Sequence, residues 1–210
     1  MASHHTIRRA ILILLAALLT LAVSAGGMPA QAGINGQWAT KAPMPTARSE
    51  SAAGAINGQL YVAGGNGSTG TLATLEVYDP STDTWTAKTS MPAAVFGAAS
   101  AVINGRLYIA GGASSSPAQP GPFNTLYSYD PATDTWSSKA PMPTPRQVFA
   151  AGAVNGQLFA IGGDPGGGIA QTAVNEVYDP STNTWTTAAP MPTARYEMAS
   201  GVTRLSHFLR

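Results

Sequence analysis

An all-β fold made of repeated four-stranded sheets is predicted by three features of the sequence. Glycine supplies 23 and proline 16 of the 210 residues, which favours many tight turns over long helices. Tryptophan, Gly-Gly, Tyr-Asp-Pro and Met-Pro recur along the chain with a common spacing of about 50 residues, which is the signature of a repeat architecture. Asn-Gly dipeptides lie between short strand-like runs and predict β-hairpins.

Composition excludes several classes of protein. Charged residues make up 10% of the chain, the formal net charge is +1, and no cluster of Lys and Arg exceeds the pair Arg8-Arg9, so we expect no nucleic-acid partner. There is no cysteine, which excludes disulfides, thiolate metal sites and thiol nucleophiles. No metal site and no cofactor is predicted.

The N-terminal segment has the pattern of a secretory signal peptide. Arg8-Arg9 precedes an uncharged apolar run over 11–23, and small-residue cleavage sites end at Ala25 and Ala32. The apolar run is shorter than the roughly 20 residues that a membrane-spanning helix needs. We therefore expect residues 1–32 to be removed and residues 33–210 to be secreted or periplasmic, with no membrane association after cleavage.

Each repeat predicts four short strands. In the first repeat these are 51–56, 60–63, 75–78 and 84–87. Asn57-Gly58 suits a type I′ turn between the first two strands, and Gly64-Gly65 ends the second strand. The turn over 79–83 contains a proline and two aspartates, and we interpret it as a turn and not as a metal loop. The predicted sheets with their flanking turns are 49–88, 96–139 and 147–188.

A sheet of this size hides one face only by packing against a copy of itself, and radial packing produces a β-propeller. Three complete sheets are too few for the 4–8 blades of a closed propeller. We predict an incomplete arc of three blades with partial strands at 37–40 and 196–203, followed by an aberrant tail over 204–210. Its open blade faces would favour self-association.

The repeated motifs closely resemble kelch repeats. The resemblance rests on the Gly-Gly doublets, on Tyr-Asp-Pro-Ser-Thr-Asp-Thr-Trp at 78–85 and on Met-Pro-Thr-Ala-Arg at 44–48, and it covers nearly all of residues 38–202. With the leader, it suggests a secreted bacterial kelch protein. The resemblance implies a kelch-type propeller whose loops bind a protein or a carbohydrate, rather than an enzyme. Two alternatives remain: a sugar mutarotase or epimerase similar to N-acetylneuraminate epimerase, and a non-functional fragment of a six- or seven-bladed propeller.

Candidate ligand-binding residues lie where the Met-Pro-x-x-Arg segments meet the variable loops that follow each second strand. They are Arg48, Glu50, Arg146, Arg195 and Glu197. Arginine could hold a carboxylate ligand by bidentate hydrogen bonds, and i, i+2 spacing would place each Arg-x-Glu pair on one face of a strand. The alternative is that each arginine braces neighbouring blades. The second repeat has Val95 instead of arginine. Variation among Glu76, Tyr127 and Glu176 suggests a blade surface.

Overall fold

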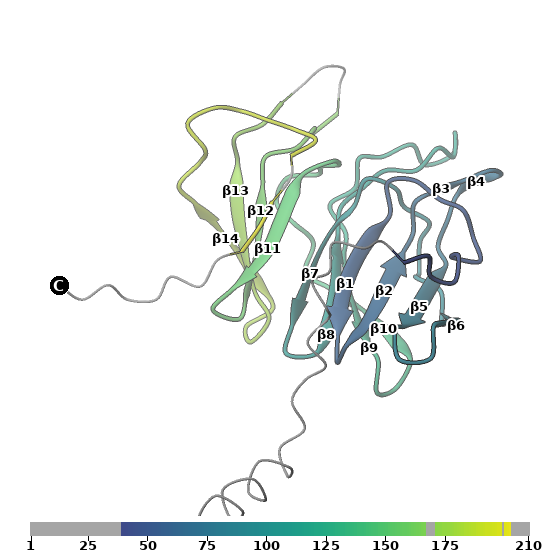
Figure 1. Ribbon diagram of the computed structural model, residues 1–210. Coiled ribbons are helices and arrows are strands. Elements are labelled where there is room, and N and C mark those ends of the chain that lie inside the picture. The colour runs from purple at the N-terminus through teal and green to yellow at the C-terminus, as the bar shows by residue number, and fades with distance from the viewer. Residues whose placement is uncertain (1–38, 167–170, 199, 203–210) are drawn as a thin grey trace, which may run out of the picture. The chain divides into compact units, whose positions relative to one another are not determined.

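Three four-stranded antiparallel sheets make up the chain in the computed structural model, which describes residues 39–166, 171–198 and 200–202 (Figure 1). The chain divides into one unit over Met1–Thr40 and a second over Lys41–Arg210, and all of the strands belong to the second. The predicted signal peptide and the tail over 204–210 lie outside the described residues. Within the described part, no helical segment has the length and hydropathy that a membrane crossing requires.

Each sheet is one predicted repeat, with its strands in chain order. The first blade contains β1 (Ala52–Ile56), β2 (Gln59–Ala63), β5 (Leu75–Asp79) and β6 (Thr84–Lys88). The second contains β7 (Ala99–Ile103), β8 (Arg106–Ala110), β9 (Leu126–Asp130) and β10 (Thr135–Lys139). The third contains β11 (Ala150–Val154), β12 (Gln157–Ile161), β13 (Asn175–Asp179) and β14 (Thr184–Ala188). A small hairpin of β3 (Asn66–Gly67) and β4 (Gly70–Thr71) extends from the first blade.

The Asn-Gly turns are formed as predicted. In the first blade, Ile56 pairs with Gln59 across the hairpin, and Asn57 and Gly58 have φ angles of 51° and 81°. Two consecutive positive φ angles are the requirement of a type I′ turn, which asparagine and glycine meet with the least strain. The other two hairpins have φ angles of 50° at both asparagines and of 73° and 78° at the glycines.

The hydrophobic core lies between the blades. One buried cluster joins Tyr61 and Leu75 of the first blade to Leu107 and Tyr129 of the second. A second cluster repeats the arrangement between the second and third blades. Strand β1 packs against β7, and β7 packs against β11, so the first strands of successive blades lie side by side. The prediction that each sheet buries its apolar face against a sister sheet is therefore confirmed.

The described residues at the two ends form no strand. Residues 39–40 and the described part of 196–202 have no ladder partner. The C-terminal segment nevertheless follows the path of a first strand: Ser200 Oγ donates to the Ala151 carbonyl at 3.2 Å, as Ser100 Oγ donates to the Ala53 carbonyl at 2.6 Å. In the second blade β7 pairs with β8, whereas no described strand is available to pair with 196–202.

Candidate interaction face

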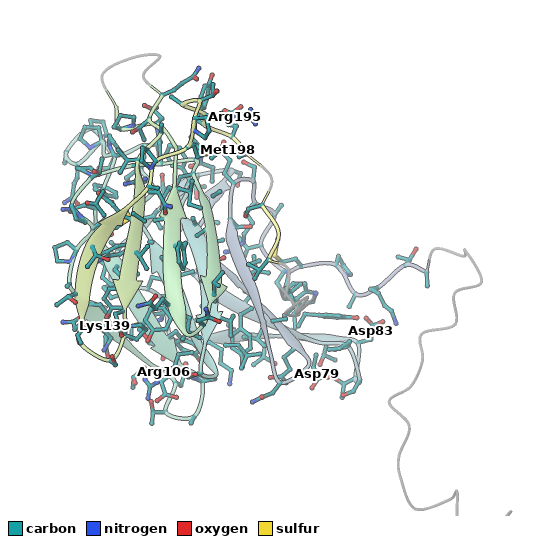
Figure 2. All side chains as sticks on the ribbon, turned by 90° about the vertical axis from the view of Figure 1, so that its left-hand side faces the viewer. Asp79, Asp83, Arg106, Lys139, Arg195 and Met198 are labelled. Carbon is teal, nitrogen blue, oxygen red and sulfur yellow. The ribbon has the colours of Figure 1, made fainter. Side chains whose placement is uncertain are left out.

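The two ends of the blades differ in chemical character. One end carries the Asn-Gly turns and the turns between each third and fourth strand, which are nearly identical in all three blades. The other end carries the loops between each second and third strand, which differ in length and sequence. We call this second end the loop face; its loops are 66–74, 113–125 and the described part of 164–174. In Figure 2, Arg195 and Met198 lie at this end and Asp79, Asp83, Arg106 and Lys139 at the opposite end.

Neighbouring loops of the loop face contact each other. Thr71 Oγ1 lies 2.8 Å from Ser115 Oγ and accepts a hydrogen bond from the Ser115 backbone N–H at 2.9 Å. Between the second and third blades, Pro122 lies close against Gly166, so that a Cβ added at Gly166 would come within 2.8 Å of the proline Cδ. The described parts of the three loops therefore form one continuous rim instead of three separate protrusions.

The Met-Pro-x-x-Arg segments hold this rim in place through their backbones. The Arg146 N–H donates to the Phe123 carbonyl at 3.0 Å, and the Gly112 N–H donates to the Arg146 carbonyl at 2.9 Å. Val95 makes the same pair of bonds to Leu72 and Gly65. The two segments between blades thereby tie the loop of one blade to the start of the next, and they lie on the loop face as the strand order predicted.

The side chains of Arg48 and Arg146 are enclosed within the blades. Arg48 Nη2 donates to Glu76 Oε2 at 2.8 Å, Nη1 donates to the Gly64 and Thr74 carbonyls, and no part of the side chain is exposed. Arg146 repeats this arrangement with Glu176, and its side chain is also fully covered. The geometry does not suit the predicted ligand-binding role of these two arginines, because protein acceptors already occupy the guanidinium groups.

The bracing alternative describes Arg146 well. Its backbone bonds to the second blade, while its side chain bonds to the third through Gly162, Val174 and Glu176. One residue therefore joins two blades. Burial is energetically acceptable because the charge is both paired and hydrogen-bonded.

The expectation that the Arg-x-Glu pairs lie on extended strands is wrong. Glu50 and Glu197 have φ angles of 54° and 52°, so the chain is not an extended strand at these positions and i, i+2 alternation does not apply. Glu50 is exposed although Arg48 is covered. Arg195 and Glu197 are both exposed on the loop face. Of the five predicted residues, the structure thus leaves three accessible.

A ladder of backbone hydrogen bonds runs across the blades beside these residues. The Gly97 N–H donates to the Glu50 carbonyl at 3.0 Å, the Val148 N–H to the Gly97 carbonyl at 2.7 Å, and the Glu197 N–H to the Val148 carbonyl at 2.8 Å. All four residues have positive φ, which is strained for a β-branched residue such as Val148. They border a shallow hollow of about 180 Å³ on the inner edge of the blades, with Phe149 and Met198. The hollow is therefore lined by the carboxylates of Glu50 and Glu197 and by the apolar side chains of Phe149 and Met198.

Sequence reasoning missed the role of Glu76 and Glu176, which had suggested a blade surface. They are the buried partners of the arginines, with 7% and 2% of their side chains exposed. A signal for this pairing was present in the repeats. The first and third blades have both the arginine and the glutamate, whereas the second has neither and carries Val95 and Tyr127. The paired loss of two opposite charges is expected for an ion pair inside a repeated unit.

At the opposite end, the Tyr-Asp-Pro turn clips the segment that enters each blade. Asp83 Oδ1 accepts hydrogen bonds from the Tyr78 hydroxyl at 2.6 Å and from the Ala42 N–H at 3.0 Å, and Trp85 Nε1 donates to the Ala42 carbonyl at 2.9 Å. The hydrogen bond from Tyr78 and then that from Ala42 lower the pKa of Asp83, and Asp83 raises the pKa of Tyr78 to about 12. The third blade makes the same clip with Asn183. These turns thus have a structural role, as predicted.

Residues 36–208 match a family model described as the KLHDC2/KLHL20/DRC7 Kelch-repeats domain. The chain belongs to the kelch-repeat family. This confirms the resemblance drawn from the Gly-Gly, Tyr-Asp-Pro and Met-Pro motifs, and kelch repeats generally mediate protein–protein interactions.

Known relatives share the repeats over part of their own length. Kelch-like protein 26 of Danio rerio is 34% identical over 127 residues, which are 60% of this chain and 20% of that protein. Beta-scruin of Limulus polyphemus is 32% identical over 143 residues, 65% of this chain and 16% of that protein. This kelch chain therefore spans about a fifth or less of these relatives.

A solved structure shows the same fold. The "Structure of YjhT" superposes with a TM-score of 0.66 over 76% of this chain and 58% of that chain, at 22% sequence identity. At that identity the likeness establishes the architecture alone. The kelch-type arrangement of four-stranded antiparallel blades is thus confirmed, and the described blades form an arc that does not close.

Proposed function

We propose that this kelch chain is an exported interaction module that binds a protein ligand through its loop face. The observation that carries the proposal is the continuous rim in which Thr71 contacts Ser115 and Pro122 contacts Gly166. Loops that differ between repeats, held at fixed positions by a regular scaffold, are where binding residues usually lie. Kelch repeats in general serve protein–protein interaction, which agrees with a protein ligand.

The hollow beside the rim adds a chemical preference. Glu50 and Glu197 are exposed on either side of an apolar floor that includes Phe149 and Met198. Carboxylates around an apolar centre favour a ligand segment that carries a basic side chain next to an apolar one. Phenylalanine and methionine are enriched at the cores of protein interfaces.

The geometry gives less support to the carbohydrate and epimerase alternatives. An acidic sugar was expected to be held by the arginines, but Arg48 and Arg146 are enclosed and already paired with glutamates. Arg195 alone remains exposed among the three. A single exposed guanidinium is a weak basis for recognising a sugar carboxylate or for acid–base chemistry on a ring.

Site-specific photo-crosslinking tests the proposed face. A photoreactive amino acid is placed at Ser115 on the loop face and, as a matched control, at Ser81 in the turn at the opposite end; both positions are exposed. We expect Ser115 to crosslink a defined protein in the extracytoplasmic fraction, in competition with unlabelled chain, and Ser81 to give no such product. The same product from both positions, or from Ser81 alone, would contradict the proposal.

A further inference from the structure

The first and third blades each expose one apolar face. The equivalent faces inside the array are covered by a neighbouring blade. Val154 of β11 is 38% exposed, whereas its equivalents Ile56 and Ile103 are 3% and 4% exposed because the next blade covers them. Leu60 of β2 is 39% exposed, whereas its equivalents Leu107 and Leu158 are fully buried by the preceding blade. We call the first surface the tail face (Gly152, Val154, Phe159 and Ile161) and the second the head face (Leu60 and Tyr78).

These faces are the two halves of an interface that the chain already makes twice. At the first interface Tyr61 packs on Tyr129 with ring centroids 6.0 Å apart, and at the second Tyr108 packs on Tyr178 at 6.1 Å. The corresponding residues at the open ends are Phe159 on the tail face and Tyr78 on the head face. The aromatic contact thus has one member at each open end of the chain.

The tail face also has the small residue against which Leu60 of the head face could pack. At the first interface Gly54 lies so close to Leu107 and Val102 that an added Cβ would come within 2.7 Å and 2.8 Å of their methyl groups. Gly152 is the equivalent residue of the tail face, and Val202 already lies against it as Val102 lies against Gly54. A hollow of about 280 Å³ lined by Val154, Phe159 and Ile161 remains beside it.

The segments that lead into and out of the array are identical in sequence. Residues 42–48 and 189–195 are both Ala-Pro-Met-Pro-Thr-Ala-Arg. Between two blades such a segment bonds to both of them. The Arg146 backbone bonds to the second blade and the Arg146 side chain bonds to the third.

At each end of the array the segment bonds to one blade only. The Arg48 side chain is bound within its blade, but its N–H and carbonyl have no backbone partner among the described residues. The Arg195 N–H and carbonyl are bound to Thr172 and Gly163, but its side chain is exposed and makes no ion pair within the described part of the chain. The side-chain bonds of Arg48 and the backbone bonds of Arg195 together correspond to the full set that one interior segment makes.

We propose that two copies of this chain associate head to tail, with the head face of each copy on the tail face of the other. Residues 42–48 of the incoming copy take the place of residues 189–195 and make the same backbone bonds to Gly163 and Thr172. The segment over 196–202 forms no strand pairing, and its displacement gives up the hydrogen bonds of Glu197 to Val148 and of Ser200 to Ala151 and the contact of Val202 with Gly152. Two arcs of three blades give six, within the 4–8 blades of closed propellers, so a heterologous contact of this kind closes on itself.

Sedimentation equilibrium of the purified chain at micromolar concentration tests the association. We expect a particle of twice the single-chain mass, without larger species. A monomer at up to about 100 μM would overturn the proposal. An open-ended series of larger species would overturn the closed pair.

Two charge-introducing variants identify the faces. Leu60→Glu alters the head face and Val154→Glu alters the tail face, and both sites are already partly exposed, so each variant should fold. We expect each variant alone to be monomeric, with at least a tenfold loss of association. Mixed together they should form a dimer held by one interface, since the intact tail of one meets the intact head of the other, while the second interface carries both glutamates and stays open.

Thr186→Glu is the matched control. Thr186 is exposed, and its equivalents Thr86 and Ser137 stay exposed although the second blade has neighbours on both sides. This variant should dimerise as the original chain does. Dimers that survive both Leu60→Glu and Val154→Glu, or a mixture of those two that stays monomeric, would overturn head-to-tail pairing. The test requires no loop-face ligand, although in the pair Glu50 and Ser51 of the incoming copy take the places of Glu197 and Met198 beside the hollow.

Discussion

The guanidinium of Arg146 donates to the carboxylate of Glu176 with both side chains almost fully enclosed, at 0% and 2% exposure. Removal of one partner from a buried pair leaves a charge without compensation, at a cost of about 3–5 kcal/mol. We therefore expect Arg146→Val to lower the free energy of unfolding by about that amount at neutral pH. Urea denaturation followed by tryptophan fluorescence measures it.

The second blade supplies the compensating variant. It carries Val95 and Tyr127 in place of the arginine and glutamate, and Val95 is only 2% exposed. We expect the double variant Arg146→Val/Glu176→Tyr to recover more than half of the loss caused by Arg146→Val. An additive loss in the double variant would show that the two positions are energetically independent.

The acid stability of the chain should depend on the aspartates that clip the entering segments. Hydrogen bonds from Tyr78 to Asp83 and from Tyr129 to Asp134, followed by backbone N–H donors, lower the pKa of both carboxyl groups. A carboxyl group whose pKa is lower in the folded state stabilises the fold above its unfolded pKa of roughly 4, and this contribution is lost as the pH falls through the folded pKa.

Asn183 suggests a substitution that would make the stability of the fold less dependent on acidic pH. It accepts the hydrogen bonds from Tyr178 and Ala140 that an aspartate accepts in the other blades. The double variant Asp83→Asn/Asp134→Asn should therefore fold normally at pH 7 and lose less stability than the original chain between about pH 5 and pH 3. Thermal unfolding across this range measures the difference; an unchanged acid profile would contradict the assignment.

Two glycines with similar backbone angles should differ in their tolerance of alanine. Gly105 has φ of 73° and nothing within 4 Å of an added Cβ, so Gly105→Ala should cost only the conformational strain of about 1–2 kcal/mol. Gly111 has φ of 61°, but an added Cβ would overlap the Arg146 carbonyl oxygen and lie 2.9 Å from the Phe149 ring. Gly111→Ala should cost about 1–3 kcal/mol more. Equal losses would contradict this explanation of the Gly-Gly doublet.

Export predicts a defined mature N-terminus. The arrangement of Arg8-Arg9, an apolar run and small residues ending at Ala32 is typical of a cleaved signal peptide. N-terminal sequencing of the chain recovered outside the cytoplasm should begin at Gly33. Replacement of Ala30 and Ala32 by bulky residues should cause the uncleaved form to accumulate, whereas full-length chain in the cytoplasm of the original protein would contradict export.

Local sequence signals determined the secondary structure and the fold family. The Asn-Gly pairs require two positive φ angles in a row, and the structure has them at all three hairpins. The Tyr-Asp-Pro turns and the spacing of about 50 residues predicted four-stranded blades, which are present. These features could be predicted because each depends on a few adjacent residues whose backbone preferences are strong.

The site depended on contacts between segments far apart in the chain. The i, i+2 spacing pairs Arg48 with Glu50, but a backbone turn at Glu50 separates the two side chains and Glu76 is the partner of Arg48. Whether an arginine on such a segment is buried or exposed is decided by the presence of a following blade, as the contrast of Arg146 with Arg195 shows. Period, turn chemistry and family are thus properties of short sequence segments. Burial, ion pairing and accessibility are properties of the stacked blades, because only packing removes water from a charge.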